Sequence, residues 1–237
     1  THETTNPLPT PPENALNRLF LARRTCREPV NRPITLAQLG DCLFAGLRLI
    51  GEVETETGPL PLKTTPSGGA RNPFEAYVLA RHVEGLEPGI FHYAGSQHSL
   101  CRLPARPPET VAELLGDQDW VEAMPCIVFL VAYLERTMWK YSDSNAYRVV
   151  LIEAGHIGQN IMLAAAAAGL SACPTAALAH TAIRHLLGLT RLTHAPLYAL
   201  TLSHPAEMVP ARVSPVRGGH SFRPGPAAPE VQEMRRT

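Results

Sequence analysis

The sequence predicts an α+β fold with one main domain, and three observations support this prediction. Helical and alternating apolar segments follow one another in irregular order, not as repeated strand–helix–strand units. Two alternating segments, 89–93 and 98–103, are separated only by AGSQ, which predicts a β-hairpin in the middle of the chain. Of the 237 residues, 45% are hydrophobic, which is enough for one sizeable core. We expect this domain at 13–210, with extended or poorly ordered proline-rich ends at 1–12 and 211–237.

The apolar periods define the elements on either side of this hairpin. Leucine, isoleucine and phenylalanine at spacings of three and four predict amphipathic helices at 15–24 and 36–50. Alternation over 74–81 predicts a half-buried strand, whereas the continuous apolar run 126–134 predicts a strand buried on both faces. A short helix at about 179–187 and a strand at 196–203 complete the predicted core.

The longest predicted element is a helix over 145–170. Its apolar side chains form one continuous stripe, made of Val150, Ala154, Ile157, Ile161, Ala165 and Ala168. Gly169 stands where helices often end. A second set, Glu153, His156 and Asn160, shares another face. Glu-x-x-His can bind metal, but di-iron sites need this pair twice with two further glutamates, so we expect no metal. We expect instead a polar seam that forms hydrogen bonds across a helix pair or a dimer interface.

Charge and cysteine content limit the class of protein. Lysine plus arginine and aspartate plus glutamate both number 21, so no net field would attract nucleic acid or an anionic membrane. Five cysteines without a CxxC pair fit a reducing compartment, and we expect a cytoplasmic protein. We find no apolar run that predicts a membrane span and no signal-peptide pattern. A dinucleotide fingerprint, a Walker loop and a GxSxG elbow are also absent from the sequence.

Four short segments carry the functional signal: RRTCR (23–27), the open loop TPSGGARNP (65–73), MWKYSDSNAYR (138–148) and GLSACPTAAL (169–178). In this order they resemble the nitroreductase superfamily of flavoproteins, and within it the SagB-type dehydrogenases, the azoline oxidases of thiazole and oxazole peptide pathways. The resemblance covers about 19–203. It implies a central mixed, mainly antiparallel sheet flanked by helices, in an obligate homodimer that holds two FMN molecules at its interface.

The resemblance also implies that an arginine-rich segment binds FMN. Arg23, Arg24 and Arg27, with Thr25 between them, would hold the phosphate, the ribityl chain and the ring edge, because a planar guanidinium offers several donors at once. The alternative is that the end of a helix simply favours cations.

Two further segments would contact the flavin ring. The loop residues that would cross the dimer boundary to the neighbouring subunit's flavin are Pro66, Ser67, Gly68 and Gly69. Glycine lets a backbone approach a ligand closely, but the same residues could form an ordinary surface turn. The residues expected to place backbone amides near N5, where hydride is received, are Cys173, Pro174 and Thr175. We expect Cys173 to be a packed small residue rather than a nucleophile.

Lys140 and Tyr141 are the predicted catalytic pair. The resemblance assigns to such a pair the proton that leaves carbon while hydride moves to flavin N5. A lysine amine can act as a base only where it is neutral, which a desolvated site beside cations favours. The alternative is a solvated lysine beside a packed tyrosine. Arg136 and Arg148 flank the pair, and either could steer an anionic substrate or lower the pKa of the lysine.

The predicted reaction is oxidation of a thiazoline or oxazoline to the azole, with O2 reoxidising the flavin. The expected partners are a second copy of the chain and a peptide-bound or carrier-protein-bound substrate, in association with a cyclodehydratase or a peptide synthetase. Two alternatives stay open. One is an NAD(P)H-dependent reductase of nitro compounds or quinones, and the other is a flavin-binding scaffold subunit of a biosynthetic complex.

Overall fold

The computed structural model describes residue 6 and residues 8–206, so the expectations for 1–5, 7 and 207–237 lie outside the described residues. The helices are α1 (Ala15–Ala22), α2 (Leu36–Leu47), α3 (Leu134–Met138), α4 (Asn145–Ala167) and α5 (His180–Leu186), with 3-10 turns η1 (Gly68–Ala70), η2 (Ala112–Leu115) and η3 (Asp119–Ala123). The strands are β1 (Ile34–Thr35), β2 (Leu49–Val53), β3 (Leu60–Lys63), β4 (Phe74–Ala80), β5 (Val83–Glu84), β6 (Gly89–Ala94), β7 (Ser99–Arg102), β8 (Cys126–Tyr133), β9 (Ser171–Thr175) and β10 (His194–Ser203).

Six strands form the central sheet, in the order β7-β6-β4-β8-β10-β9, and every neighbouring pair is antiparallel. Val78 of β4 lies opposite Phe91 of β6 on one side and Val128 of β8 on the other. The predicted hairpin is confirmed as β6 and β7. Within the described part of the chain, the parallel pairing joins β1 to β5, outside this sheet. The sheet expected to be mixed is therefore antiparallel throughout.

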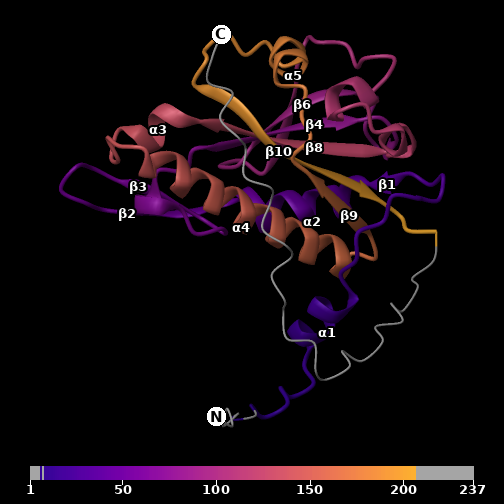
Figure 1. Ribbon diagram of the computed structural model, residues 1–237, viewed down its shortest axis with the longest axis horizontal. Helices are drawn as coiled ribbons and strands as arrows, with labels where there is room; N and C mark the ends of the chain where they lie inside the picture. The colour runs from indigo at the N-terminus through magenta and orange to yellow at the C-terminus, as the bar shows by residue number, and fades with distance from the viewer. Residues whose placement is uncertain (1–5, 7, 207–237) are drawn as a thin grey trace, which may run out of the picture. The chain divides into compact units, whose positions relative to one another are not determined.

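The central strand β8 shows why the sheet is covered on both faces. Its residues alternate between two cores, with Val128 and Leu130 in the core that includes α2 and α4, and Phe129 and Val131 in the other. Residues of η2, η3 and α5 pack on the second face. Figure 1 shows α2 and α4 on one side of the strands and α5 on the other. The strand predicted to be buried on both faces is confirmed, as is the α+β class.

Helix α4 packs in the first layer against α2. Four residues of its predicted stripe, from Val150 to Ile161, are at most 5% exposed, and Gly169 follows the helix with a φ of 72°, as predicted. A Cβ built at Gly46 of α2 would lie 2.8 Å from Cγ1 of Ile161, so glycine permits the two helices to approach closely. By length and composition α4 is the one described helix that could cross a membrane, yet it packs here as a core helix.

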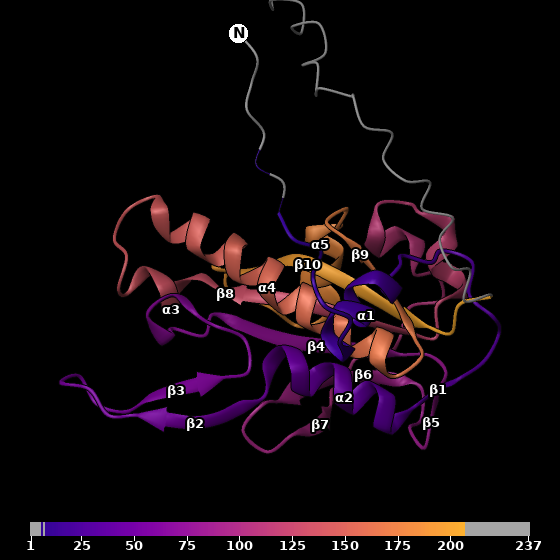
Figure 2. The same ribbon diagram turned by 90° about the horizontal axis from the view of Figure 1, so that it is seen from below.

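The structure corrects the sequence prediction at two places. The helix predicted over 36–50 ends at Leu47, because Leu49 begins β2 and donates its backbone N–H to the Gly95 carbonyl (3.2 Å). The sequence spacing did not reveal this contact with the β6–β7 hairpin, nor the pairing of β2 with β3. Figure 2 shows the β2–β3 hairpin at the end of the fold where α3 lies. Residues 171–175, to which the sequence analysis assigned no secondary structure, form the edge strand β9.

Candidate functional site

The arginine segment, residues 23–27, leaves α1 and lies against the beginning of β9. Ser171 Oγ donates a hydrogen bond to the Arg24 carbonyl oxygen (2.9 Å). The Arg27 guanidinium lies 5.5 Å from the ring centroid of Trp120. Within the described residues, no arginine of this segment forms an ion pair with an acidic side chain. Their charges are therefore open to an external anion, while Thr25 is exposed.

Residues 173–175 lie beside this segment. Burial raises the pKa of the Cys173 thiol, and the nearby Arg27, which acts in the opposite direction, does not offset it. This agrees with a packed rather than a nucleophilic cysteine. Thr175 Oγ1 accepts a hydrogen bond from Gln118 Nε2 (3.3 Å), and Trp120 Nε1 donates to Gln118 Oε1 (3.1 Å). The sequence did not single out Gln118 or Trp120, because their segment has no periodicity and reaches the site only through the fold.

Strand β9 is the last strand of the sheet, so only one of its edges is paired. Cys173 lies opposite Thr201 and Pro174 opposite Leu200, both on β10. No other described strand pairs with β9. Backbone groups on an unpaired strand edge are free to bond a ligand. The unpaired edge of β9 is therefore compatible with the prediction that residues 173–175 present backbone groups to the flavin ring.

The glycine loop, residues 65–73, has an unusual backbone. Gly69, Ala70 and Asn72 have positive φ values of 61°, 53° and 47°. For the two non-glycine residues this conformation costs about 1–3 kcal/mol each and persists only when surrounding contacts hold it. Asn72 is central to these contacts, because its backbone N–H donates to Ser67 Oγ (2.8 Å) and its Nδ2 donates to the Pro61 and Ala70 carbonyls (2.7 and 3.1 Å).

Lys140 and Tyr141 lie against the glycine loop of their own chain. A Cβ built at Gly69 would be 2.7 Å from Lys140 Nζ, and one built at Gly68 would collide with Val149 and lie 3.7 Å from Tyr141 Oη. Side chains of the same chain therefore favour glycine at both positions. The sequence had indicated only the approach of a ligand as the reason for these glycines. Lys140 is exposed in the single chain, whereas Tyr141 is half-buried.

A buried ion pair lies beneath the same loop. Lys63 Nζ is 2.7 Å from Glu153 Oε1, and both side chains are only 2% exposed. The other carboxylate oxygen, Oε2, accepts a hydrogen bond from Ser67 Oγ (2.6 Å). Burial lowers the pKa of Lys63, although Glu153 acts to raise it. Sequence reasoning missed Lys63, since nothing in its spacing connects it to α4.

The polar seam predicted on α4 is confirmed for Asn160. Asn160 Nδ2 donates to the Ala45 carbonyl of α2 (3.2 Å) and to Thr65 Oγ1 (3.0 Å), and Glu153 is buried in the ion pair. The bond from Asn160 to Ala45 crosses the α2–α4 pair, as expected, whereas Glu153 bonds to β3 and to the glycine loop. His156 is exposed in the single chain, and its expected place in a dimer interface stays a prediction.

Arg136, one of the two arginines that flank the predicted catalytic pair, has bonded partners within the chain. Its Nη2 lies 2.6 Å from Glu75 Oε1, and its Nη1 donates to the Asn72 carbonyl (3.0 Å). His92 Nε2 lies 2.8 Å from Glu75 Oε2. Burial raises the pKa of Glu75, but the hydrogen bonds and charges of His92 and Arg136 outweigh burial, so the pKa is lowered overall. Arg148 is exposed.

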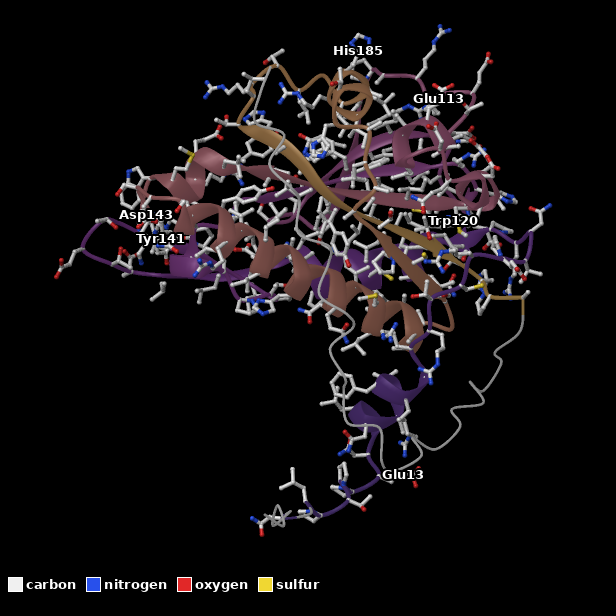
Figure 3. All side chains as sticks on the ribbon, in the orientation of Figure 1. Glu13, Glu113, Trp120, Tyr141, Asp143 and His185 are labelled. Atoms are coloured by element: carbon white, nitrogen blue, oxygen red, sulfur yellow. The ribbon has the colours of Figure 1, made fainter. Side chains whose placement is uncertain are left out.

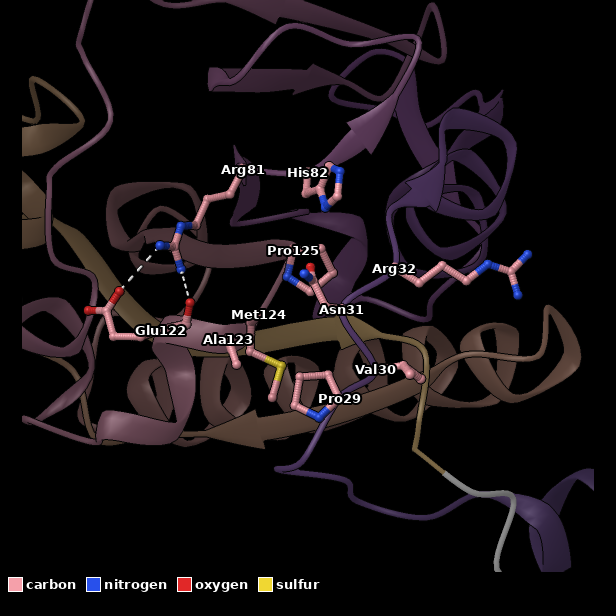
Figure 4. Close-up of a pocket in the computed structure, with 10 residues that line it drawn as sticks. All are labelled: Pro29, Val30, Asn31, Arg32, Arg81, His82, Glu122, Ala123, Met124 and Pro125. Carbon is pink, nitrogen blue, oxygen red and sulfur yellow. Dashed lines mark hydrogen bonds and ion pairs between the residues drawn. The ribbon is translucent and has the colours of Figure 1, made fainter.

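Two cavities lie at different places along β4. A cavity of about 370 Å³ adjoins the glycine loop and has Lys63, Arg71 and Arg136 in its lining. Another, of about 320 Å³, lies where β4 ends and β8 begins, and Figure 4 shows its lining. There Arg81 Nη2 is 3.3 Å from the Glu122 carboxylate, and both side chains are partly exposed. None of the residues predicted for the site lines the second cavity.

The predicted site residues therefore fall into two clusters at opposite ends of α4. Val149, beside the glycine loop, lies near the start of the helix, and Ser171, beside the arginine segment, follows its end. From Val149 to Ala167 the helix extends about 27 Å, at a rise of 1.5 Å per residue. Figure 3 shows Tyr141 and Trp120, one from each cluster, far apart. A single chain does not bring the two clusters into one site.

The antiparallel sheet, the α2–α4 layer and the edge strand beside an arginine segment define a nitroreductase-like α+β fold. The family model described as "Nitroreductase family" matches residues 21–204. The chain belongs to the nitroreductase family and is an oxidoreductase of that family. The superfamily predicted from the four sequence segments is thus confirmed.

Two relatives are similar in sequence. The chain is 34% identical over 181 residues to MJ1384 of Methanocaldococcus jannaschii, named as a nitroreductase, in a match that covers 76% of this chain and 87% of that protein. It is 31% identical over 142 residues to the trifolitoxin-processing protein TfxB of Rhizobium leguminosarum bv. trifolii, which covers 56% of this chain. That second match spans only 37% of TfxB.

Two solved structures share the fold at low identity. One is a chain of the E. coli microcin synthetase McbBCD complex with truncated pro-MccB17 bound, with a TM-score of 0.60, 18% identity, and 87% of this chain and 79% of that chain covered. The other is the NADPH:FMN oxidoreductase from Vibrio harveyi complexed with NAD+, with a TM-score of 0.55, 18% identity, and 82% and 70% covered. At such identities the likeness establishes the fold.

Proposed function

We propose that this protein is an FMN-dependent dehydrogenase that oxidises a thiazoline or oxazoline ring, in a peptide or a carrier-tethered intermediate, to the azole. The observation that carries this proposal is the contact of Lys140 and Tyr141 with the glycine loop. This contact supports the proposal because Lys140, the candidate base, lies beside the loop that the SagB-type resemblance assigns to the flavin ring. A reductase that takes hydride from nicotinamide needs no base to deprotonate a ring carbon.

The arginine segment and β9 fit FMN in charge and shape. Arginines without ion-pair partners among the described residues suit a dianionic phosphate, and the unpaired edge of β9 suits a flat ring with polar edges. When bound, FMN would accept the hydride and then be reoxidised by O2. The residues that would hold it are Arg23, Arg24, Thr25, Arg27, Cys173, Pro174 and Thr175 from one subunit and Pro66, Ser67, Gly68 and Gly69 from the other.

A second copy of this chain is the partner that would complete the site. On α4, Leu151 and Ile152 are exposed, and a Cβ added at the adjoining Gly155 would meet nothing within 4 Å. Helix α1, which contacts α4, exposes Phe20 and Leu21. Exposed apolar side chains gathered in this way favour association. Twofold pairing with antiparallel α4 helices would bring the loop end of one helix to the arginine end of the other.

Each site of such a dimer would combine the two clusters. Lys140 and Tyr141 would come from the subunit that supplies the glycine loop, because they contact that loop in their own chain. Oxidation to the azole removes one hydride and one proton from the ring. The Lys140 amine would take the proton, and the Tyr141 hydroxyl would orient the ring. The neighbouring subunit would cover Lys140 and supply the desolvated surroundings that a neutral amine requires.

The named roles of two relatives support a peptide as substrate. TfxB is named as a trifolitoxin-processing protein, and the McbBCD structure is titled as a synthetase with a truncated pro-MccB17 bound. By this analogy the substrate of our protein would arrive from a cyclodehydratase or a peptide synthetase. The five cysteines are free thiols in the structure, which is compatible with the cytoplasm as the proposed location.

A second function is supported by the other two relatives. MJ1384 is named as a nitroreductase, and the Vibrio harveyi protein is an NADPH:FMN oxidoreductase by title. An NAD(P)H-dependent nitro or quinone reductase would use the arginine segment and β9 in the same way, but not Lys140. A flavin-binding scaffold subunit would keep these contacts without turnover.

The proposal is tested with Lys140→Ala and with Arg191→Ala as a control at an exposed cation outside the predicted site. FMN content is read from flavin absorbance, and azole formation from an azoline-containing peptide is read by the loss of two mass units. We expect Lys140→Ala to retain FMN and lose azole formation, and Arg191→Ala to retain both. Fast NADPH-dependent nitroreduction that is indifferent to Lys140→Ala, without azole formation by the wild type, would establish the reductase instead.

Mixing two inactive variants tests the shared site. Arg27→Ala and Lys140→Ala impair opposite ends of α4, so a mixed dimer holds one site with both residues intact. Random exchange should restore about a quarter of wild-type activity, because half of the dimers are mixed and each has one intact site. Mixed dimers that form but remain inactive would contradict a site built from two chains.

A further inference from the structure

The chain has two lysines, Lys63 and Lys140, and the rest of its 21 lysine and arginine residues are arginines. Both lysines lie next to the glycine loop. Lys63 lies beneath the loop, paired with Glu153 of α4. Lys140 lies on the loop, with its Nζ 2.7 Å from the position of a Cβ at Gly69. The loop therefore separates a buried ammonium group from an exposed one.

A short series of contacts connects these groups. Lys63 Nζ is 2.7 Å from Glu153 Oε1, and Glu153 Oε2 accepts from Ser67 Oγ at 2.6 Å. Ser67 Oγ in turn accepts from the Asn72 N–H at 2.8 Å. Ser67 immediately precedes the two glycines that contact Lys140, Tyr141 and Val149. Ser67 is thus bonded from both sides, directly before the two glycines.

The loop needs such support because its backbone is strained at non-glycine residues with positive φ. A buried carboxylate with a lysine partner is costly to move, since any displacement would leave an unpaired charge in the interior. Glu153 is carried by α4, a long helix of the core, and it therefore gives Ser67 an acceptor at a well-defined position.

We propose that Glu153 is a positioning residue: held by Lys63, it fixes Ser67 and thereby the Gly68–Gly69 surface on which Lys140 rests. The ion pair beneath the loop sets the place of the amine above it. This inference rests on the proposed function only in assigning the role of a base to Lys140. The positioning itself is a property of the folded chain.

The test compares two variants that differ only in the acceptor offered to Ser67. Lys63→Met/Glu153→Gln removes both charges but keeps an amide oxygen near Ser67, whereas Lys63→Met/Glu153→Leu removes the acceptor as well. In both variants Lys140 is the only lysine, so acetylation by limiting acetic anhydride, followed by mass spectrometry, reports on its side chain without ambiguity. The measurement needs neither FMN nor substrate.

We expect the Leu variant to acetylate Lys140 several-fold faster than wild type, and the Gln variant to keep the wild-type rate. Ser67→Ala, which leaves the ion pair intact, should match the Leu variant and serves if that variant does not fold. Gln38→Met, which removes the Gln38 Nε2 hydrogen bond to the Ala168 carbonyl (2.9 Å) far from the loop, controls for general loss of stability. It should leave the rate unchanged.

Equal rates in the Gln and Leu variants, or a Ser67→Ala rate equal to wild type, would overturn the positioning role. The outcome separates this inference from the proposed function. If the Leu variant changes Lys140 acetylation several-fold while Lys140→Ala leaves azole formation unchanged, the positioning role of Glu153 stands. Lys140 is then rejected as the base.

Discussion

The buried pair of Lys63 and Glu153 should be strongly coupled in a double-mutant cycle of stability. Lys63→Met and Glu153→Leu each leave a buried charge without its partner, which costs about 3–5 kcal/mol when both groups are as buried as the 2% exposure here indicates. The double variant leaves no charge behind, so its cost should be about 1–2 kcal/mol, mainly for the Ser67 hydroxyl that loses its acceptor. The single costs sum to about 6–10 kcal/mol, so the free energies should be non-additive by about 4 kcal/mol or more.

Urea unfolding followed by far-UV circular dichroism, at one protein concentration, gives the three free energies and shows through equal m values that the transition is the same. Glu153→Leu has a second signature. Burial lowers the pKa of Lys63 from its ordinary 10.5, so the unfolded chain binds the Lys63 proton more tightly than the folded chain does. The loss of stability in Glu153→Leu should therefore shrink as pH rises toward 10.5. A double variant as unstable as the sum of the single variants would refute the reasoning.

Three other changes test packing and pH dependence. Gly46→Ala should lower stability by about 1–3 kcal/mol, because its Cβ would overlap Ile161 where α2 crosses α4, and an unchanged Tm would contradict this close approach. Phe129→Ala, 1% exposed on β8, should cost about 3–5 kcal/mol in urea unfolding, and a loss below 1 kcal/mol would mean that this core can collapse around the gap. Burial, assisted by Arg32, lowers the pKa of His204 below its ordinary 6.5, so the unfolded chain takes up the proton first and stability should fall as pH drops below 6.5. His204→Asn should flatten that fall between about pH 7.5 and 5.5, and equal slopes in the two proteins would exclude His204 as its source.

Regular periodicity made most of the sheet predictable. The alternation in β4 is a signal of period two, the continuous apolar run of β8 is typical of a strand buried on both faces, and the stripe on α4 is a signal of period 3.6. The spacing of leucines failed at Leu49, where a backbone hydrogen bond to Gly95 ends helical structure. It failed again at β9, which is too short and too rich in small residues to show a period.

The site was predictable as a set of segments but not as an arrangement. The arginine segment and the glycine loop stand out in the sequence because several donors or several small residues are adjacent. Lys63 and Trp120 do not stand out, since each is a single residue whose partner is distant in sequence. Their roles depend on which helix face or strand edge they meet after folding.

The sequence by itself determined the α+β class, the family resemblance and the candidate residues, because local patterns and adjacent donors are written along the chain. Only the tertiary structure decided that these residues occupy opposite ends of α4 and that Lys140 rests on Gly69 above a buried ion pair. The physical reason is that these contacts depend on how the glycine loop, the β2–β3 hairpin and α4 pack together. Packing brings together residues that are far apart in the sequence and follow no regular spacing.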